Sequence, residues 1–338
     1  MRIAVLGLGF MGSTHLKALR HIPSATLAAV VSADEKKLTG DLSDIQGNLG
    51  GPGEKLDFSS VRKYKTVEEA LRDPAIDAVD ICLPTAMHAP VATEALRAGK
   101  HVLVEKPMAL DGESCDAMIA EANRAGRVLM TAQVLRFFPD YEMARGILQS
   151  RSLGAVRSAF LRRRCAAPSW SKWLHDEGQS GGGVFDLLIH DVDFAIHLFG
   201  RPTAVSALGH ENMPGGIDYI VAQLHYPEIG PVTITGGWHH PKAYPFSMEF
   251  TIVSDGGTLE YSSAGRPLVL YGANGESEAF ATAEVDGYQA EIEYFIECAA
   301  AARQPERCPA GESAAAVKIT RLMLESRSRY GEKIACSL

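Results

Sequence analysis

The sequence predicts an α/β protein with two domains, and three observations support that prediction. The chain opens with an apolar run at residues 2–6 (RIAVL) that breaks directly into a glycine-rich turn and then a helix-like stretch. Apolar strands and helical patterns alternate through the first part of the chain, which is typical of a parallel sheet. Beyond that part, short strands are separated by Gly and Pro signals, which is typical of antiparallel pairing.

Length and composition agree with this organisation. At 338 residues the chain exceeds one core, since domains cluster near roughly 100–200 residues. We therefore expect two domains. The net charge of −8, from 33 basic and 41 acidic residues, comes with no long basic tract. This argues against a nucleic acid or an anionic membrane as a partner.

The chain carries no sign of export or of a membrane span. Met1 leads straight into the first strand, and no stretch approaches about 18 apolar residues. We therefore expect a soluble, cytoplasmic protein. The six cysteines are scattered without a C-x-x-C pair, which predicts free structural thiols rather than a zinc site or a disulfide framework.

The glycine-rich turn has the spacing of a dinucleotide cradle. Gly7 permits the tight turn, Gly9 lets the backbone approach a pyrophosphate, and Gly12 allows close packing of helix on strand. Phe10 and Met11 lie between them at the helix start, where unpaired N–H groups face the ligand. The pattern predicts a Rossmann domain that binds NAD or NADP, against the simpler alternative of an ordinary strand–helix turn.

The end of the second strand bears on the choice of dinucleotide. The strand at residues 26–32 runs out into Ser32-Ala33-Asp34-Glu35-Lys36-Lys37. A carboxylate there would repel a 2′-phosphate, whereas Ser32 with Lys37 would bind one, so the segment favours NADP. The alternative is that the lysines form a solvated helix face.

Further candidates follow later strands of the same domain. Residues 39–60, rich in Gly, Asp and Ser, read as a surface excursion near the adenine end, and residues 66–71 as a short capped helix. The strand at residues 78–83 ends in a turn whose polar groups should lie beside the dinucleotide, because the carboxyl ends of parallel strands face the ligand crevice. The residues expected there are Pro84, Thr85 and His88.

A lysine stands where chemistry would occur. The strand at residues 101–104 ends in Glu105-Lys106-Pro107, and we expect Glu105 and Lys106 to lie beside the cofactor. An ammonium group at a strand end can hydrogen-bond a substrate oxygen and stabilise negative charge that forms on it.

The motifs GLGFMG, PTAMH and EKP, in that order, resemble the Gfo/Idh/MocA family of glucose–fructose oxidoreductase and myo-inositol dehydrogenase. The resemblance covers nearly the whole chain. It implies a Rossmann domain at residues 1–125, followed at residues 126–338 by a C-terminal α/β domain on an open, mostly antiparallel sheet. It also implies an active-site role for Lys106 and a homodimer or homotetramer formed through that sheet.

The second half of the chain carries a matching motif. Residues 181–183 are glycines, and Asp186 and His190 follow in the D-x-x-x-H pattern of the family. Positions four apart share a helix face, so the carboxylate can orient the imidazole for acid–base work near neutral pH. Asp186, His190, Asp193 and His197 also form a stripe, but it climbs roughly 16 Å, too far to share one ion. We therefore predict no metal.

Polar and aromatic residues supply candidates for substrate contacts. A sugar stacks its apolar face on aromatic rings and hydrogen-bonds through its edge. Trp170 and Trp173 lie on the loop before the glycine run, although core packing is the commoner fate of tryptophan. The other candidates are Gln133, Arg136, Tyr141, Arg162 and His190 itself.

Strand signals fill the rest of the second domain. Apolar or alternating runs are found at residues 128–135, 156–165, 204–208, 219–226, 232–238, 247–254 and 258–262. Helices are expected near residues 288–302 and 312–330. The strands form an antiparallel meander with one face on helices and the other open to solvent or a partner subunit.

These observations favour NAD(P)-dependent transfer of a hydride between a sugar or polyol carbon and a nicotinamide. His190 would accept the hydroxyl proton, Lys106 would hold the same oxygen, and Asp186 would orient His190. Two alternatives stay open. The fold can serve a non-catalytic dinucleotide sensor, or the bound cofactor can act transiently during glycoside cleavage.

Overall fold

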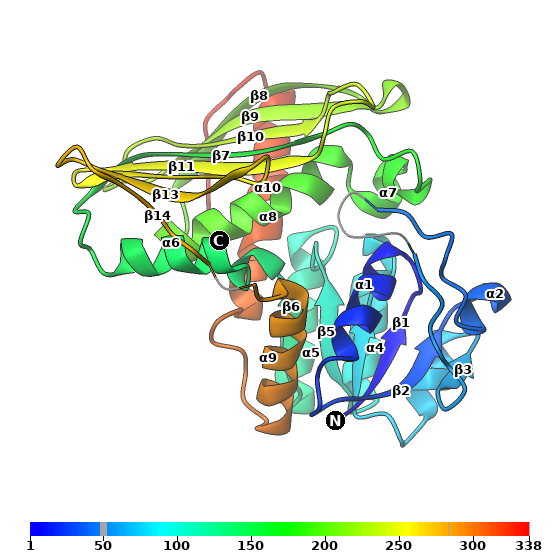
Figure 1. The fold of residues 1–338 in the computed structure, drawn as a ribbon. Helices are drawn as coiled ribbons and strands as arrows, with labels where there is room; N and C mark the ends of the chain where they lie inside the picture. The colour runs from blue at the N-terminus through cyan, green and yellow to red at the C-terminus, as the bar shows by residue number, and fades with distance from the viewer. Residues whose placement is uncertain (48–52, 283, 338) are drawn as a thin grey trace. The chain divides into compact units, whose positions relative to one another are not determined.

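A computed structural model describes residues 1–47, 53–282 and 284–337 (Figure 1). The chain forms two compact units, the first from residues 1–134 and 286–314 and the second from residues 135–285 and 315–338. This division differs from the expected boundary at residue 125. The strand at residues 129–132 joins the parallel sheet of the first unit, and the chain returns to that unit after its long excursion.

The first unit is built on a parallel sheet of six strands in the order β3-β2-β1-β4-β5-β6. This is the strand order of a Rossmann domain, so the predicted fold is confirmed. The bounds are β1 Arg2–Leu6, β2 Thr26–Val31, β3 Arg62–Tyr64, β4 Ala78–Ile81, β5 His101–Glu105 and β6 Leu129–Ala132.

The helices of this unit are α1 Phe10–Leu19, α2 Glu35–Leu38, α3 Val67–Arg72, α4 His88–Arg97, α5 Gly112–Ala125 and α9 Gly287–Ala300. Thr66 and Glu69 form the predicted capping box of α3. Helix α9, from the returning segment, packs on α1. Of the predicted excursion at residues 39–60, the described part holds an isolated bridge between Asp41 and Lys55, and residues 48–52 lie outside the described residues.

The second unit carries a nine-stranded sheet in the order β14-β13-β12-β11-β7-β10-β9-β8-β15. Only the pairing of β7 with β10 is parallel among these described strands, so the mostly antiparallel sheet is confirmed. The bounds are β7 Val156–Cys165, β8 Ala204–Asn212, β9 Ile217–His225, β10 Val232–Trp238, β11 Ser247–Ser254, β12 Gly257–Ser262, β13 Arg266–Gly272, β14 Ser277–Ala279 and β15 Ile334–Ala335.

Helices cover one face of this sheet (Figure 1). They are α6 Pro139–Gln149, α8 Gly183–Phe199 and most of α10 Ala310–Ser328, with the short α7 Glu177–Ser180 before α8. The alternation of side chains along β7 turns Leu161 and Arg163 toward the helices and Phe160 and Arg162 away from them.

Two further sequence predictions concern the chain as a whole. All six cysteines are free thiols, as predicted. Among the described helices, none combines the length and the apolar character that crossing a bilayer requires.

Candidate active-site residues

The glycine turn after β1 is shaped by contacts that no side chain could share. Gly7 has a φ of +98°, and a Cβ there would lie 2.5 Å from the Cys82 carbonyl oxygen. A Cβ on Gly12 would lie 1.9 Å from the carbonyl oxygen of Gly7. At Gly9, by contrast, a Cβ would meet nothing within 4 Å. The turn is therefore tightly packed at Gly7 and Gly12 and open at Gly9, the glycine whose backbone was expected to approach a pyrophosphate.

At the amino end of the helix that follows this turn, no side chain caps the backbone N–H groups. Gly9 is the N-cap of α1, no side chain caps the helix, and its first turn, which begins with Phe10 and Met11, holds no acidic residue. An uncapped helix start with a positive dipole end is suited to an anion. The residues present thus fit a dinucleotide pyrophosphate.

The residues expected to discriminate between NAD and NADP follow the end of β2. Asp34 caps α2, and its carboxylate accepts the backbone N–H groups of Lys36 and Lys37 at 2.9 and 3.4 Å. The Ser32 hydroxyl accepts the Asp34 N–H at 3.1 Å, and the Lys36 ammonium is bound by Asp44. Lys36 and Lys37 are the two basic residues that follow Ser32 in this segment, and Lys37 is half-buried.

The turn after β4 holds two buried polar side chains, one with hydrogen-bond partners and one without them among the described residues. Both ring nitrogens of the buried His88 lie 2.8 Å from carbonyl oxygens, those of Pro107 and Leu83, and burial lowers the pKa of His88. His88 therefore ties together the loops that follow β4 and β5. Thr85, next to Pro84, is 1% exposed, and its hydroxyl has no hydrogen-bond partner among the described residues.

The neighbouring strand ends add two more groups at the same edge of the sheet. Glu105 is 5% exposed, and its carboxylate accepts the backbone N–H of Lys106 at 3.0 Å. The Lys106 side chain is half-buried. After β6, Gln133 is 1% exposed, and neither end of its amide has a partner among the described residues. Unsatisfied buried amides are costly, so this group is suited to a ligand.

Helix α8 in the second unit begins at the glycine run. Gly182 has a φ of +95°, and a Cβ on Gly183 would lie 2.5 Å from the indole of Trp238. The carboxylate of Asp218, on β9, accepts the Val184 N–H at 2.8 Å and so caps the helix from another strand. The sequence analysis did not single out Asp218, because its partner is 34 residues distant in the chain.

Asp186 and His190 occupy a special position on α8. Asp186 and His190 are half-buried, whereas all the remaining residues from Gly183 to Ile196 are buried. They lie one turn apart on one face, as the D-x-x-x-H spacing predicts. The face that can meet a ligand is thus limited to a carboxylate and an imidazole in this part of the helix.

The acids that follow His190 are tied to buried arginines. Arg136 and Asp193 form a bidentate pair at 2.8 and 2.7 Å, with side chains 0% and 1% exposed. Arg163 pairs with Asp191 at 2.7 Å. Asp193 therefore cannot belong to a metal stripe along the helix. The expected substrate contact of Arg136 is corrected as well, because its guanidinium is enclosed with Asp193.

Three other expected substrate contacts differ in outcome. Arg162 lies on the face of the sheet opposite α8 and pairs with Glu249, so its predicted place near His190 is wrong. The cause is strand alternation, which turns Arg163 inward instead. Trp170 is half-buried before α7, while Tyr141 is 2% exposed and packs edge-on against Phe194, as a core residue does.

A hollow of about 640 Å³ opens beside the amino end of α8. Gly182, Asp218, Arg321 and Arg327 are among the residues that line it, and Asp186 and His190 are not. The hollow therefore belongs to the capping side of α8, and the half-buried acid and imidazole lie elsewhere on the helix.

Comparisons with known proteins agree with this architecture. Residues 1–133 match the model of the oxidoreductase family with an NAD-binding Rossmann fold, and residues 141–260 match the GFO/IDH/MocA C-terminal domain. An uncharacterized oxidoreductase of Escherichia coli K12 is 31% identical to this chain. The matched segment covers 68% of this chain and 62% of that relative. The scyllo-inositol 2-dehydrogenase (NAD+) of Bacillus subtilis 168 is 28% identical over 90% of this chain and 88% of the relative.

A solved structure resembles the fold over its full length. Levoglucosan dehydrogenase, in complex with NADH and levoglucosan, has a TM-score of 0.85, 18% identity and complete coverage of both chains. Together with the two matching domain models, the glycine cradle and the D-x-x-x-H helix show that this chain belongs to the Gfo/Idh/MocA family of oxidoreductases.

Proposed function

We propose that the protein is an NAD(P)-dependent dehydrogenase of a sugar, a polyol or a related cyclic alcohol. The observation that carries the proposal is the carboxyl edge of the first unit's sheet. There the open glycine cradle and the half-buried Lys106 follow strands of the sheet, together with Thr85 and Gln133, two buried polar groups that have no hydrogen-bond partner within the described part of the chain. Family relatives that are named as inositol and levoglucosan dehydrogenases support the substrate class.

Each polar group has a distinct role in this proposal. A bound nicotinamide supplies the carbon that accepts the hydride. Lys106 donates a hydrogen bond to the reacting hydroxyl oxygen and stabilises the negative charge that forms on it. His190 takes the hydroxyl proton, and Asp186 orients the imidazole and favours its protonated form. Gln133 donates to or accepts from a further substrate hydroxyl, and Trp170 provides an aromatic surface for the ring.

Single substitutions test these roles. A polyol and sugar screen that follows the absorbance of reduced nicotinamide identifies a substrate. Lys106→Ala and His190→Ala should then lower kcat/KM about 10²–10⁴-fold, the usual range for a positioned acid–base group. Lys63→Ala, which removes an exposed lysine of β3, is the matched control and should leave the rate unchanged. Wild-type turnover in either active-site variant would refute the assignment, and product formation without net cofactor reduction would indicate glycoside cleavage instead.

We also propose that the preferred dinucleotide is NADP. The Asp34 carboxylate is engaged in capping α2, so the groups beside the end of β2 that remain suited to a 2′-phosphate are the Ser32 hydroxyl and the Lys37 ammonium. Ser32→Asp should move the ratio of kcat/KM values toward NAD by at least about 10-fold, because the new carboxylate repels a 2′-phosphate. An unchanged ratio would contradict this choice.

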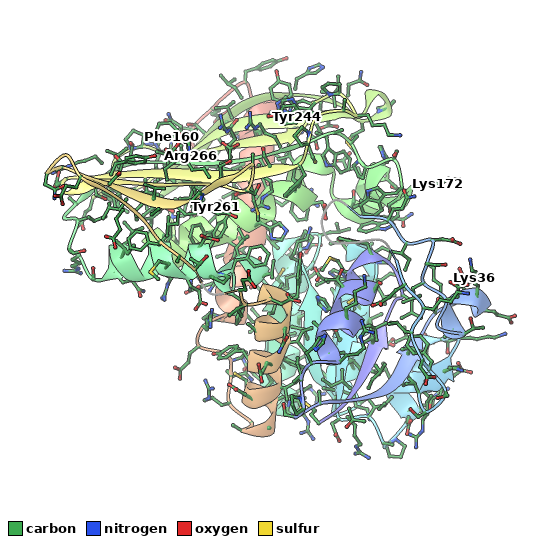
Figure 2. The ribbon with its side chains drawn as sticks, viewed as in Figure 1. Lys36, Phe160, Lys172, Tyr244, Tyr261 and Arg266 are labelled. Atoms are coloured by element: carbon green, nitrogen blue, oxygen red, sulfur yellow. The ribbon has the colours of Figure 1, made fainter. Side chains whose placement is uncertain are left out.

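A homo-oligomer through the second unit's sheet completes the proposal. The face opposite α8 exposes large apolar side chains: Val221 (49%) and Leu208 (59%), which are paired across β9 and β8, and Phe160 (47%) on β7. Figure 2 shows Phe160 on that face of the sheet. Exposed large apolar side chains on one sheet face are typical of a subunit interface. Phe160→Asp should shift the protein toward a monomer in sedimentation velocity, and an unchanged distribution would count against this interface.

A further inference from the structure

A buried charge network lies beneath the glycine turn of the first unit. His15, on α1, is 0% exposed, and its Nδ1 lies 2.9 Å from the carboxylate of Asp80 on β4. Its Nε2 lies 3.0 Å from Oε1 of Glu105 on β5, as an ion pair rather than an aligned hydrogen bond. The other oxygen of Glu105 accepts the backbone N–H of Lys106 at 3.0 Å. One chain of contacts thus runs from α1 to the residue proposed to hold the substrate oxygen.

The donor atoms in this cluster do not have the spacing of a tetrahedral zinc site. His15, Asp80 and Cys82 have ligand atoms within 4.8 Å of one another. However, tetrahedral ligands at zinc distances are about 3.3–3.5 Å apart, whereas Nδ1 and the Asp80 oxygen are already 2.9 Å apart. The two carboxylates also lie on opposite ring nitrogens of His15, so they cannot share one ion. The contacts are those of a hydrogen-bonded ion network.

The charge state of the network follows from its neighbours. The groups that face His15 are Asp80, Cys82, Glu105 and the Tyr288 ring on α9. Burial opposes the charged imidazole, but the Asp80 carboxylate and the other partners outweigh it, and the pKa of His15 is raised well above its ordinary value. An imidazolium between two carboxylates leaves both ring N–H groups as donors.

We propose that His15 is a positioning residue for the reaction. It holds the Glu105 carboxylate, which in turn fixes the backbone of Lys106. His15 thereby links α1, the helix after the glycine turn, to Lys106. The inference rests on the proposed dehydrogenase function. Breaking such a link misplaces a reacting group, and small displacements of that kind lower the rate strongly without weakening ligand binding to the same degree.

A neutral replacement of His15 tests the link. In His15→Gln the two carboxylates lose their shared cation. The pKa of His15 is raised well above its ordinary value, so this loss is felt most at low pH, where the wild-type imidazole is charged, and least where it becomes neutral. We expect kcat to fall about 10-fold at neutral pH, with a larger deficit at pH 6 than at pH 9, and dinucleotide affinity to change less than about 3-fold. Asp80→Asn, which weakens the network from its other end, should act in the same direction.

The matched control is His101→Gln. His101 is a buried histidine at the amino end of β5, where it accepts the Val128 N–H. Its replacement should lower thermal stability without a pH-dependent deficit in kcat. In addition, His15→Gln should add no further loss in a Lys106→Ala background, because residues that act through one another are not additive. Full additivity, or a pH-independent loss shared with His101→Gln, would overturn the inference.

Amide hydrogen exchange separates this inference from the proposed function. In the protein without dinucleotide, exchange at the Lys106 N–H should be about 10-fold faster in His15→Gln than in the wild type, and unchanged in His101→Gln. If that acceleration is seen while no alcohol is oxidised, the link stands and the proposed function fails. If alcohols are oxidised but neither the exchange nor the pH profile changes, the link is wrong.

Discussion

The enclosed pair of Arg136 and Asp193 gives the sharpest test of how the second unit is held together. Both side chains are essentially unexposed, and two hydrogen bonds of 2.8 and 2.7 Å join them. Asp193→Leu leaves a guanidinium buried without its counter-charge, which costs about 3–5 kcal/mol. A unit of this size loses about 2–4 °C per kcal/mol, so the melting temperature should fall by about 6–20 °C.

The double variant Arg136→Met/Asp193→Leu distinguishes a structural role from substrate binding. Replacing a whole buried ion pair by apolar residues is often neutral or stabilising, so the melting temperature should return to near that of the wild type. If Arg136 only anchors α8, KM for the identified alcohol should stay within about 3-fold. A stable double variant whose KM rises 10-fold or more would refute the reasoning and restore Arg136 as a substrate contact.

Three further predictions concern the cradle, the helix start and acid stability. Gly9→Ala should keep the wild-type melting temperature but weaken dinucleotide binding at least about 10-fold in a fluorescence titration, because its Cβ meets no protein atom and enters the space proposed for the pyrophosphate. Gly183→Ala should lower the melting temperature, since its Cβ would lie 2.5 Å from the ring of Trp238. The pKa of Asp73 is lowered to about 2, chiefly by the backbone N–H of Ala75, so its stabilising effect is present above about pH 4 and lost toward pH 2. Asp73→Asn should therefore reduce urea stability at pH 7 and flatten its decline in acid, and an unchanged acid limb would contradict this cause.

Local patterns were enough to predict much of the fold. Residues 232–238 and 247–254 were predicted as strands with the bounds that the structure shows, because their apolar runs end at Gly, Pro or His signals. The return of residues 286–314 to the first unit was missed, since nothing in that segment distinguishes a helix that packs on one domain from a helix that packs on another. Strands β13 and β14 were also missed. The three residues of β14 are all exposed and carry no apolar pattern, whereas β13 holds the apolar run LVLY, which was a strand signal that the analysis did not use.

The site residues divide according to the range of the interactions that fix them. Arg162 was misplaced although its strand carried the necessary signal, because apolar Leu161 on the inner face requires Arg163, two residues on, to be inner as well. The buried network was not predicted, but a charged Asp80 inside the apolar run AVDICL was a signal that a partner must be present. That the partner is His15, 65 residues away, depends on packing and not on local sequence.

The position of His190 illustrates the same dependence on distant groups. Its helix starts at a glycine run that provides no capping side chain, so the first turn relies on Asp218 of β9, which Arg327 of α10 also binds. Further along, Asp191 is held by Arg163 of β7. The helix is thus fixed at both sides of His190 by charges from separate elements. Removing the cap should then displace the amino end of α8, where Asp186 lies, more than the turn that carries His190, because the pair at Asp191 remains. If Asp186 orients His190 as proposed, Asp218→Asn should accordingly lower kcat no more than Asp186→Ala does. A loss as large as that of His190→Ala would show that the cap fixes the whole helix as one body.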